Sequence, residues 1–298
     1  MNCIALSFVG KLPEYIVDCV YQIRFFTCAM IYVITDDVSS IYIQRIISLG
    51  NIEIVNYIEL AEYSDDLKTH YSKFKVIRGL KERKELFFRS FERFYLLYGL
   101  MDKRKLRNVL FMEIDNLIYD DPQNWIDKID KDIAFMIDNV GRASTGICYV
   151  KTVDILQKML DYFNKTYLHN QPINTFFNEM GAVYNFYEKH KDECFILPSY
   201  IDDRYLADIY EQYGNMKCIF DPSTYGIFLL GYDKIHGNNG KVGKINKWGI
   251  IKDIEINQIV WKIDTEGRKR PYFLHNGFYN LICNLHIHSK NLESVLSK

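Results

Sequence analysis

The first 40 residues alternate between apolar runs and a segment with helical periodicity, and this alternation constrains the fold most strongly. The apolar runs are NCIALSFV (2–9) and AMIYVITDD (29–37). Between them, after Pro13, which suits a first helical turn, apolar residues recur at spacings of three and four: Ile16, Cys19, Val20 and Ile23. This order predicts a β-α-β unit with a right-handed crossover, and therefore a parallel sheet.

The same alternation continues along the chain and predicts one α/β domain. Strands are expected over 51–58, 108–115, 132–138 and 144–151, and helices over 81–101, 153–163 and 171–190. Residues 216–233 mix strand with turn, and glycines gather in 237–249, the expected flexible loop.

Composition excludes several classes of protein. With 48% hydrophobic and 25% charged residues, the chain of 298 residues can bury a large core. A formal net charge of −1 argues against binding nucleic acid by bulk charge.

The seven cysteines show no C-x-x-C spacing, which is typical of reduced thiols inside the cell. No apolar run reaches the roughly 18 residues of a membrane span and no signal peptide is evident, so we expect a soluble, cytoplasmic protein. The 23 Tyr and 19 Phe against 6 Pro suggest an AT-rich genome, such as that of a large DNA virus.

Polar residues collect where the predicted strands end. Ser7 and Phe8 end the first strand, Asp36 and Asp37 follow the second, and Glu113 and Asp115 end the strand over 108–115. In open α/β sheets the ligand lies outside the carboxyl ends of the strands. Two carboxylates on one side of a strand repel each other unless a cation lies between them, and Mg²⁺ or Mn²⁺ prefers such oxygen donors. A strand that merely turns into solvent is the alternative.

The tail of the chain holds further metal-ligating residues in HIHSK (286–290). His286 and His288 alternate with apolar residues, which in a strand places both imidazoles on one face. A neutral imidazole can join carboxylates around Mn²⁺. Lys290 is placed to reach a phosphate. Partly exposed histidines and an ordinary surface lysine are the alternatives.

Together these segments resemble the nucleotide-sugar glycosyltransferases of the GT-A fold. The resemblance lies in an acid-x-acid motif followed by Asn-Leu-Ile-Tyr, in the β-α-β unit ending in Thr-Asp-Asp, and in a late histidine before Ser-Lys. CIFDPSTYGIFLLGYD (218–233) is also similar to an "FD…G-x-Y-x-x-G-x-D" signature of a subgroup, with Ile227-Phe228 in place of Gln-Tyr.

The resemblance implies a single GT-A-like domain over 1–298, with a mixed, mainly parallel sheet, a Rossmann-like N-terminal half and helices on both faces. Residues 1–120 would form the nucleotide-binding half. Residues 121–298 would form the sugar and acceptor half, ending in the segment that completes the metal site.

The resemblance also implies a metal-bound donor. Glu113 takes the place of the first Asp of the family's D-x-D motif, Asp115 that of the second, and His286 or His288 that of the late histidine. Further expected contacts are to the nucleoside (Ser7, Phe8, Asp36, Asp37), to the diphosphate (Lys290), to the diphosphate or the sugar (Arg142) and to the sugar (Ser144, Thr145, Gly146). Each of these residues also has an ordinary structural explanation.

The implied reaction is Mn²⁺- or Mg²⁺-dependent transfer of a hexose-type sugar from a nucleotide-sugar, by preference a UDP-sugar, to a glycan, protein or small-molecule acceptor. Glu179 and Asp233 are the candidates for the general base on the acceptor hydroxyl if the enzyme inverts; the late-histidine pattern favours retention. A sugar-nucleotide nucleotidyltransferase is disfavoured because SFVGKLPEY (7–15) has one glycine. A degenerate GT-A-like binding protein stays open because Glu113 replaces Asp. The sugar, the acceptor and the oligomeric state cannot be read from the sequence.

Overall fold

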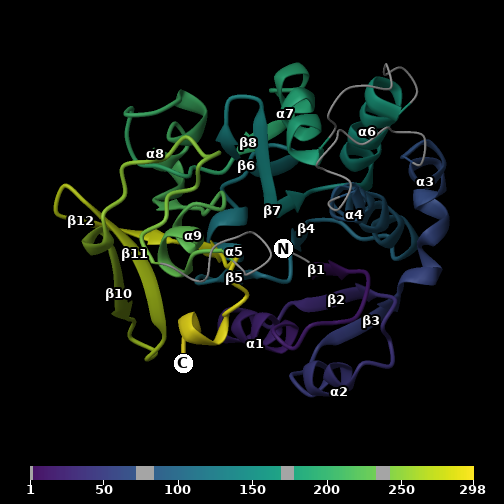
Figure 1. The fold of residues 1–298 in the computed structure, drawn as a ribbon, viewed down its shortest axis with the longest axis horizontal. Coiled ribbons are helices and arrows are strands. Elements are labelled where there is room, and N and C mark those ends of the chain that lie inside the picture. Colours follow the sequence, from purple (N-terminus) through teal and green to yellow (C-terminus); the bar gives the residue numbers. More distant parts are fainter. Residues whose placement is uncertain (1–2, 72–83, 169–177, 233–241) are drawn as a thin grey trace.

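The computed structural model describes residues 3–71, 84–168, 178–232 and 242–298 (Figure 1). The strands are β1 (Cys3–Phe8), β2 (Met30–Thr35), β3 (Ile52–Asn56), β4 (Val109–Met112), β5 (Asn116–Ile118), β6 (Ile133–Asn139), β7 (Arg142–Val150), β8 (Cys194–Ile196), β9 (Cys218–Ile219), β10 (Ile259–Ile263), β11 (Lys269–His275), β12 (Phe278–Ile282) and β13 (Asn284–His286). The helices are α1 (Ile16–Phe26), α2 (Ile41–Ile47), α3 (Asp65–Tyr71), α4 (Lys84–Lys103), α5 (Gln123–Ile126), α6 (Val153–Phe163), α7 (Glu179–Lys189), α8 (Tyr213–Met216) and α9 (Tyr225–Leu230).

The expected mixed, mainly parallel sheet is confirmed. Over the described ranges its seven strands lie in the order β3-β2-β1-β4-β7-β6-β8. Strands β3, β2, β1 and β4 are mutually parallel, β7 is antiparallel to both β4 and β6, and β8 is parallel to β6. The sheet therefore continues across residue 120, and the expected functional division into two halves stays a prediction.

The N-terminal β-α-β unit forms as predicted. The apolar positions of α1, Ile16, Cys19, Val20 and Ile23, are completely buried. Strands β1 and β2 pair in parallel from Cys3–Met30 to Phe8–Thr35. Figure 1 shows α1 and α2 below β1–β3, while α4, which packs on β1, lies with α6 and α7 on the upper side of the view.

Two sequence predictions about element boundaries were wrong. The strand expected over 108–115 ends at Met112, because the chain turns there and Asn116 N donates to Glu113 O over 3.0 Å. Residues 216–233 contain the helix α9 as well as strand and turn. Parts of three other predictions, over 81–83, 171–177 and 237–241, lie outside the described residues, and so does Asp233.

A second layer, which the sequence did not predict, is made of the four-stranded sheet β10-β11-β12-β9 and the two-stranded sheet β13-β5. Its hairpins lie at the left of Figure 1, and the C-terminus returns to α1. Because β5 directly follows the turn after β4, pairing of β13 with β5 brings the tail of the chain to the carboxyl end of the main sheet.

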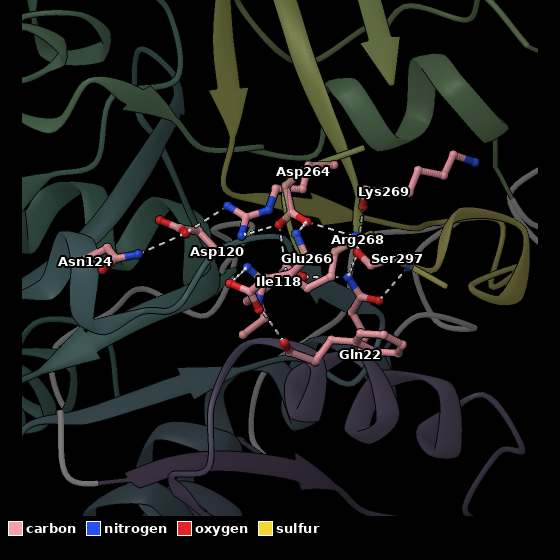
Figure 2. Close-up of polar contacts among 11 residues, drawn as sticks. Gln22, Ile118, Asp120, Asn124, Asp264, Glu266, Arg268, Lys269 and Ser297 are labelled. Carbon is pink, nitrogen blue, oxygen red and sulfur yellow. Dashed lines mark hydrogen bonds and ion pairs between the residues drawn. The ribbon is translucent and has the colours of Figure 1, made fainter. Parts of the chain in front are cut away.

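One buried glutamine fastens the tail to the first helix (Figure 2). Gln22 is fully buried on α1, and its Nε2 donates to Ile118 O at 2.7 Å and to Ser297 Oγ at 2.8 Å. Ser297 N donates back to Gln22 Oε1 at 3.0 Å. A buried amide with both ends satisfied favours one arrangement of α1, β5 and the tail over others.

The helices of the described residues include none that is both long and apolar enough to cross a bilayer.

Candidate metal and substrate site

Glu113 and Asp115 lie in the turn between β4 and β5. Glu113 N donates to Gly146 O at 2.9 Å, which continues the β4–β7 pairing for one residue beyond β4. Asp115 is 7% exposed, so its carboxylate is almost removed from water. Burial of a charged carboxylate requires nearby cations or donors, and these come from distant parts of the chain.

The imidazole of His286 reaches both acids. Strand β13 pairs antiparallel to β5 with His286 opposite Asn116, and Ile287 N then donates to Asp115 O at 2.8 Å. This register places His286 Nε2 3.1 Å from Glu113 Oε2 and 3.4 Å from Asp115 Oδ1. One ligand atom from each of the three residues lies within 4.8 Å of the others. We call Glu113, Asp115 and His286 the acid–histidine cluster.

The other side of the His286 ring is held by the segment before α9. Nδ1 of His286 lies 2.7 Å from Ser223 Oγ, and its backbone N donates to Asp221 Oδ2 at 2.9 Å. Asp221 is fully buried and also accepts from the backbone N of Thr224, Tyr225 and Gly226. Asp221 therefore holds the start of α9 against β13 and fixes the position of the histidine.

Two cations flank the cluster. Lys290 Nζ contacts Asp115 Oδ2, and Arg93, on α4, contacts Glu113 Oε1. Burial alone would raise the pKa of Asp115, but Lys290 and His286 outweigh it and hold that pKa well below its usual range. Arg93 Nη2 also donates to Thr145 Oγ1 at 2.7 Å. Asp115 is therefore a carboxylate at neutral pH.

Glu179, at the start of α7, lies at the edge of this arrangement. Its Oε1 is 3.9 Å from Arg93 Nη2, and its side chain is 11% exposed. Burial raises the pKa of Glu179, and the charge of Arg93 opposes that rise.

The cluster opens into a cavity of about 1320 Å³. Drug-sized ligands usually occupy roughly 300–1,000 Å³, so this cavity has room for more than one substrate. Most of the residues predicted from the sequence line it: Ser7, Phe8, Glu113, Asp115, Arg142, Ser144, Thr145, Gly146, Glu179, His286, His288 and Lys290. The rings of His286 and His288 have centroids 4.3 Å apart, as expected for imidazoles that face one way.

Two predicted nucleoside contacts lie elsewhere. Asp36 Oδ1 accepts from Gly10 N at 2.7 Å and Asp37 Oδ2 accepts from Leu12 N at 3.0 Å. Neither residue is among the described residues that line the cavity, so in this structure both shape the loop after β1. Arg142 lines the cavity and also pairs with buried Asp138 at 3.0 Å.

Sequence reasoning missed Arg93, Ser223 and Asp221. Arg93 lies in the charged and aromatic helix predicted over 81–101, where five arginines and lysines look alike in the sequence. Ser223 and Asp221 belong to the FDPSTYG segment that the resemblance singled out, but no role was given to them. The FDPSTYG segment was therefore the one sequence feature from which roles for Ser223 and Asp221 could have been predicted.

Solved structures of transferases align with about two thirds of the chain. Mouse xyloside xylosyltransferase 1 in its apo form is 6% identical, with a TM-score of 0.44 over 66% of this chain and 85% of that chain. The PaToxG glycosyltransferase is 13% identical, with a TM-score of 0.43 over 64% and 70%. A cytidylyltransferase from Leptospira borgpetersenii serovar Hardjo-bovis is 10% identical, with a TM-score of 0.39 over 67% and 77%.

No protein-family model matches the sequence, and no curated protein sequence is significantly similar to it. The chemistry of this chain therefore has to be derived from the residues of its cavity.

Proposed function

We propose that this chain is a metal-dependent glycosyltransferase that transfers a hexose-type sugar from a UDP-sugar to an acceptor hydroxyl. The observation that carries the proposal is the acid–histidine cluster, whose three ligand atoms lie within 4.8 Å of one another at the wall of a cavity large enough for two substrates. The sequence resemblance to GT-A enzymes points to the same residues.

The cluster fits a divalent cation in the chemistry of its donors. Two carboxylates and one neutral imidazole are ligands that Mn²⁺ accepts readily and Mg²⁺ accepts in part. Gly146 allows these side chains to approach β7 closely, because a Cβ there would lie 2.7 Å from Asn116 Nδ2, 3.1 Å from His286 Nδ1 and 3.2 Å from Glu113 Oε2. When bound, the cation would supply Lewis-acid stabilisation of the donor diphosphate.

Lys290 is placed to stabilise the leaving group, the nucleoside diphosphate. Lys290 Nζ contacts Asp115 at the cavity wall, where its positive charge is available to a bound diphosphate. In the transfer, the bond from the anomeric carbon to the β-phosphate oxygen breaks as the bond to the acceptor oxygen forms. The hydroxyl proton leaves with the nucleoside diphosphate or to solvent. Charge on the leaving oxygen is what Lys290 stabilises.

Different strands supply the two ends of the donor site. Ser7 and Phe8 at the end of β1 are the proposed contacts of the nucleoside, with Phe8 as the stacking face. Ser144, Thr145 and Gly146 on β7 are small and lie beside the cluster, which suits close approach of a sugar ring. Glu179 is the proposed polar group nearest the reacting carbon, and we favour retention of configuration over inversion.

Calorimetry tests this proposal directly. UDP is titrated into the protein with Mn²⁺ and, separately, with EDTA, and the two isotherms are compared. We expect tight binding with Mn²⁺ and at least tenfold weaker binding without it. Asp115→Asn and His286→Ala should each abolish the difference, whereas Asp130→Asn, a change at an exposed carboxylate outside the cavity lining, should preserve it.

Turnover is then measured as release of UDP from a panel of UDP-hexoses. Metal-dependent binding without any release would point to a binding protein with a degenerate site. Identical UDP isotherms with Mn²⁺ and with EDTA would remove the metal from the proposal.

A further inference from the structure

The cavity has an exposed tryptophan on its wall that the donor site does not use. Trp248 is 71% exposed and lines the cavity, whereas Trp125 is 2% exposed in the core. Ile245, 38% exposed, lines the same wall, as do Lys244 and Lys247. A large aromatic ring that borders a substrate cavity and keeps most of its surface in water is available to a ligand.

The backbone beneath this indole is firmly held. Trp248 O accepts from Asn139 Nδ2 at 2.9 Å, and Ile250 N donates to Asp138 O at 2.8 Å, so the segment is attached to the end of β6. Trp248 N donates to Asn246 Oδ1 at 3.0 Å. Asn246 is 4% exposed and donates to Ser223 O at 3.0 Å. An exposed ring on a fixed backbone offers contact area at a low cost in conformational entropy.

The backbone of Trp248 is attached on the far side of the cluster from the proposed nucleoside contacts. The strand order is β1-β4-β7-β6, with Ser7 and Phe8 on β1, the cluster acids after β4, and Trp248 attached to β6. Three strand spacings separate β1 from β6, roughly 14 Å at 4.7–4.9 Å each. A donor that runs from β1 to the cluster therefore leaves the β6 side of the cavity for the second substrate.

We propose that Trp248 is the stacking platform of a glycan acceptor, on which one face of a pyranose ring packs. A pyranose carries C–H groups on its faces and hydroxyls at its edge. The indole matches the apolar face, and Lys244 and Lys247 supply donors for hydroxyls at the edge. This inference rests on the proposed glycosyl transfer and specifies its acceptor as a sugar ring.

Intrinsic fluorescence tests the platform without any turnover. The chain has three tryptophans, and Trp248 is far more exposed than Trp125 or the half-buried Trp261. The protein is titrated with methyl glycosides of glucose, galactose, mannose and N-acetylglucosamine and with cellobiose and maltose, each with and without UDP and Mn²⁺. At least one of these probes should change the emission in a saturable way.

Substitutions of the individual tryptophans show which of them produces the change in emission. Trp248→Phe should remove the change in emission, and Trp261→Phe should keep it. Trp248→Ala should weaken binding of the responding sugar, measured by calorimetry, by roughly tenfold or more, as for the loss of an interface hot spot. Phe278→Ala, a matched control at an aromatic residue that is 74% exposed outside the cavity lining, should leave that affinity unchanged.

Two results would overturn the platform: no probe alters the emission under either condition, or UDP alone produces the Trp248 signal, which would make the indole a nucleoside contact. The proposed function fails by a different measurement, namely the loss of metal-dependent UDP binding. A sugar response at Trp248 with no UDP binding would therefore retain the sugar site while rejecting glycosyl transfer.

Discussion

His286 Nε2 lies 3.1 Å from Glu113 Oε2, although the two residues come from distant parts of the chain. The contact exists because β13 pairs with β5, and β5 begins directly after the turn that carries Glu113 and Asp115. Formation of the acid–histidine cluster is thus coupled to docking of the C-terminal layer on the main sheet.

Ser223 is predicted to set the tautomer of His286. For Nε2 to bind a cation, the proton must sit on Nδ1, which then donates to Ser223 Oγ across 2.7 Å. Ser223→Ala should therefore lower the affinity for Mn²⁺ roughly 10–100-fold, as losses of such supporting hydrogen bonds do. Mn²⁺ binding can be followed by the electron paramagnetic resonance signal of the free ion. Ser294→Ala, at an exposed hydroxyl, is the control, and equal affinities for the two variants would argue against His286 as a ligand.

Gly226→Ala should reverse the usual effect of replacing glycine by alanine in a helix. That change normally stabilises a helix by up to about 1 kcal/mol. At Gly226 the new Cβ would lie 2.1 Å from His286 O, so α9 and β13 have to separate. We expect a loss of about 1–3 kcal/mol in the free energy of unfolding and weaker Mn²⁺ binding.

The matched control is Gly214→Ala in α8, where nothing lies within 4 Å of the new Cβ. Urea unfolding of both variants measures the difference. A Gly226→Ala protein as stable as Gly214→Ala would show that β13 does not pass this close to α9.

Arg93→Ala should destabilise the protein strongly at neutral pH. The Arg93 side chain is 9% exposed and is the neighbour of both Glu113 and Glu179, so its loss leaves the buried Glu179 and the partly buried Glu113 without that cation. Removing one partner of a buried ion pair costs roughly 3–5 kcal/mol. Urea unfolding in EDTA measures this cost. Arg104→Ala, which breaks an ion pair with Glu53 whose side chains are each 36% exposed, should cost about 1 kcal/mol or less.

The parts of the fold that local sequence determines were predictable. The burial of Ile16, Cys19, Val20 and Ile23 follows from their helical spacing, and α6 begins and ends at the predicted residues. Pairing between distant strands leaves no such local trace, which is why the antiparallel β7 and the β13–β5 sheet were not predicted. A turn after Met112 was also hidden, because Ile114 continues the apolar run.

The candidate site was predictable where residue type alone is informative. Acids and histidines are rare in apolar runs, so Glu113, Asp115 and His286 stood out. Arg93 did not stand out, because the sequence of a charged helix does not distinguish a buried arginine from an exposed one. Trp248 also gave no signal, because the large majority of aromatic residues in this chain serve the core, and its exposure depends on how the loop is attached to β6.

Asp138, whose carboxylate belongs to β6, is 1% exposed. Burial raises its pKa to about 6, and the charge of Arg142, with Nη2 3.0 Å from Oδ2, offsets only part of that rise. Between pH 3.8 and about 6 the folded protein therefore holds this proton more tightly than the unfolded chain does. Raising the pH through that window removes stability, by about 3 kcal/mol in total.

The Asp138→Asn variant has no carboxyl group to titrate at this position, so its stability should not show this decrease as the pH rises. The free energy of unfolding of the variant minus that of the parent, measured with urea, should rise between pH 4 and 6 and become constant above pH 7. Asp130→Asn, at an exposed carboxylate, should follow the parent at every pH. A difference that stays constant from pH 4 to 7 would mean that Arg142 keeps Asp138 ionised throughout, and that the pair is a permanent buried ion pair beside the segment carrying Trp248.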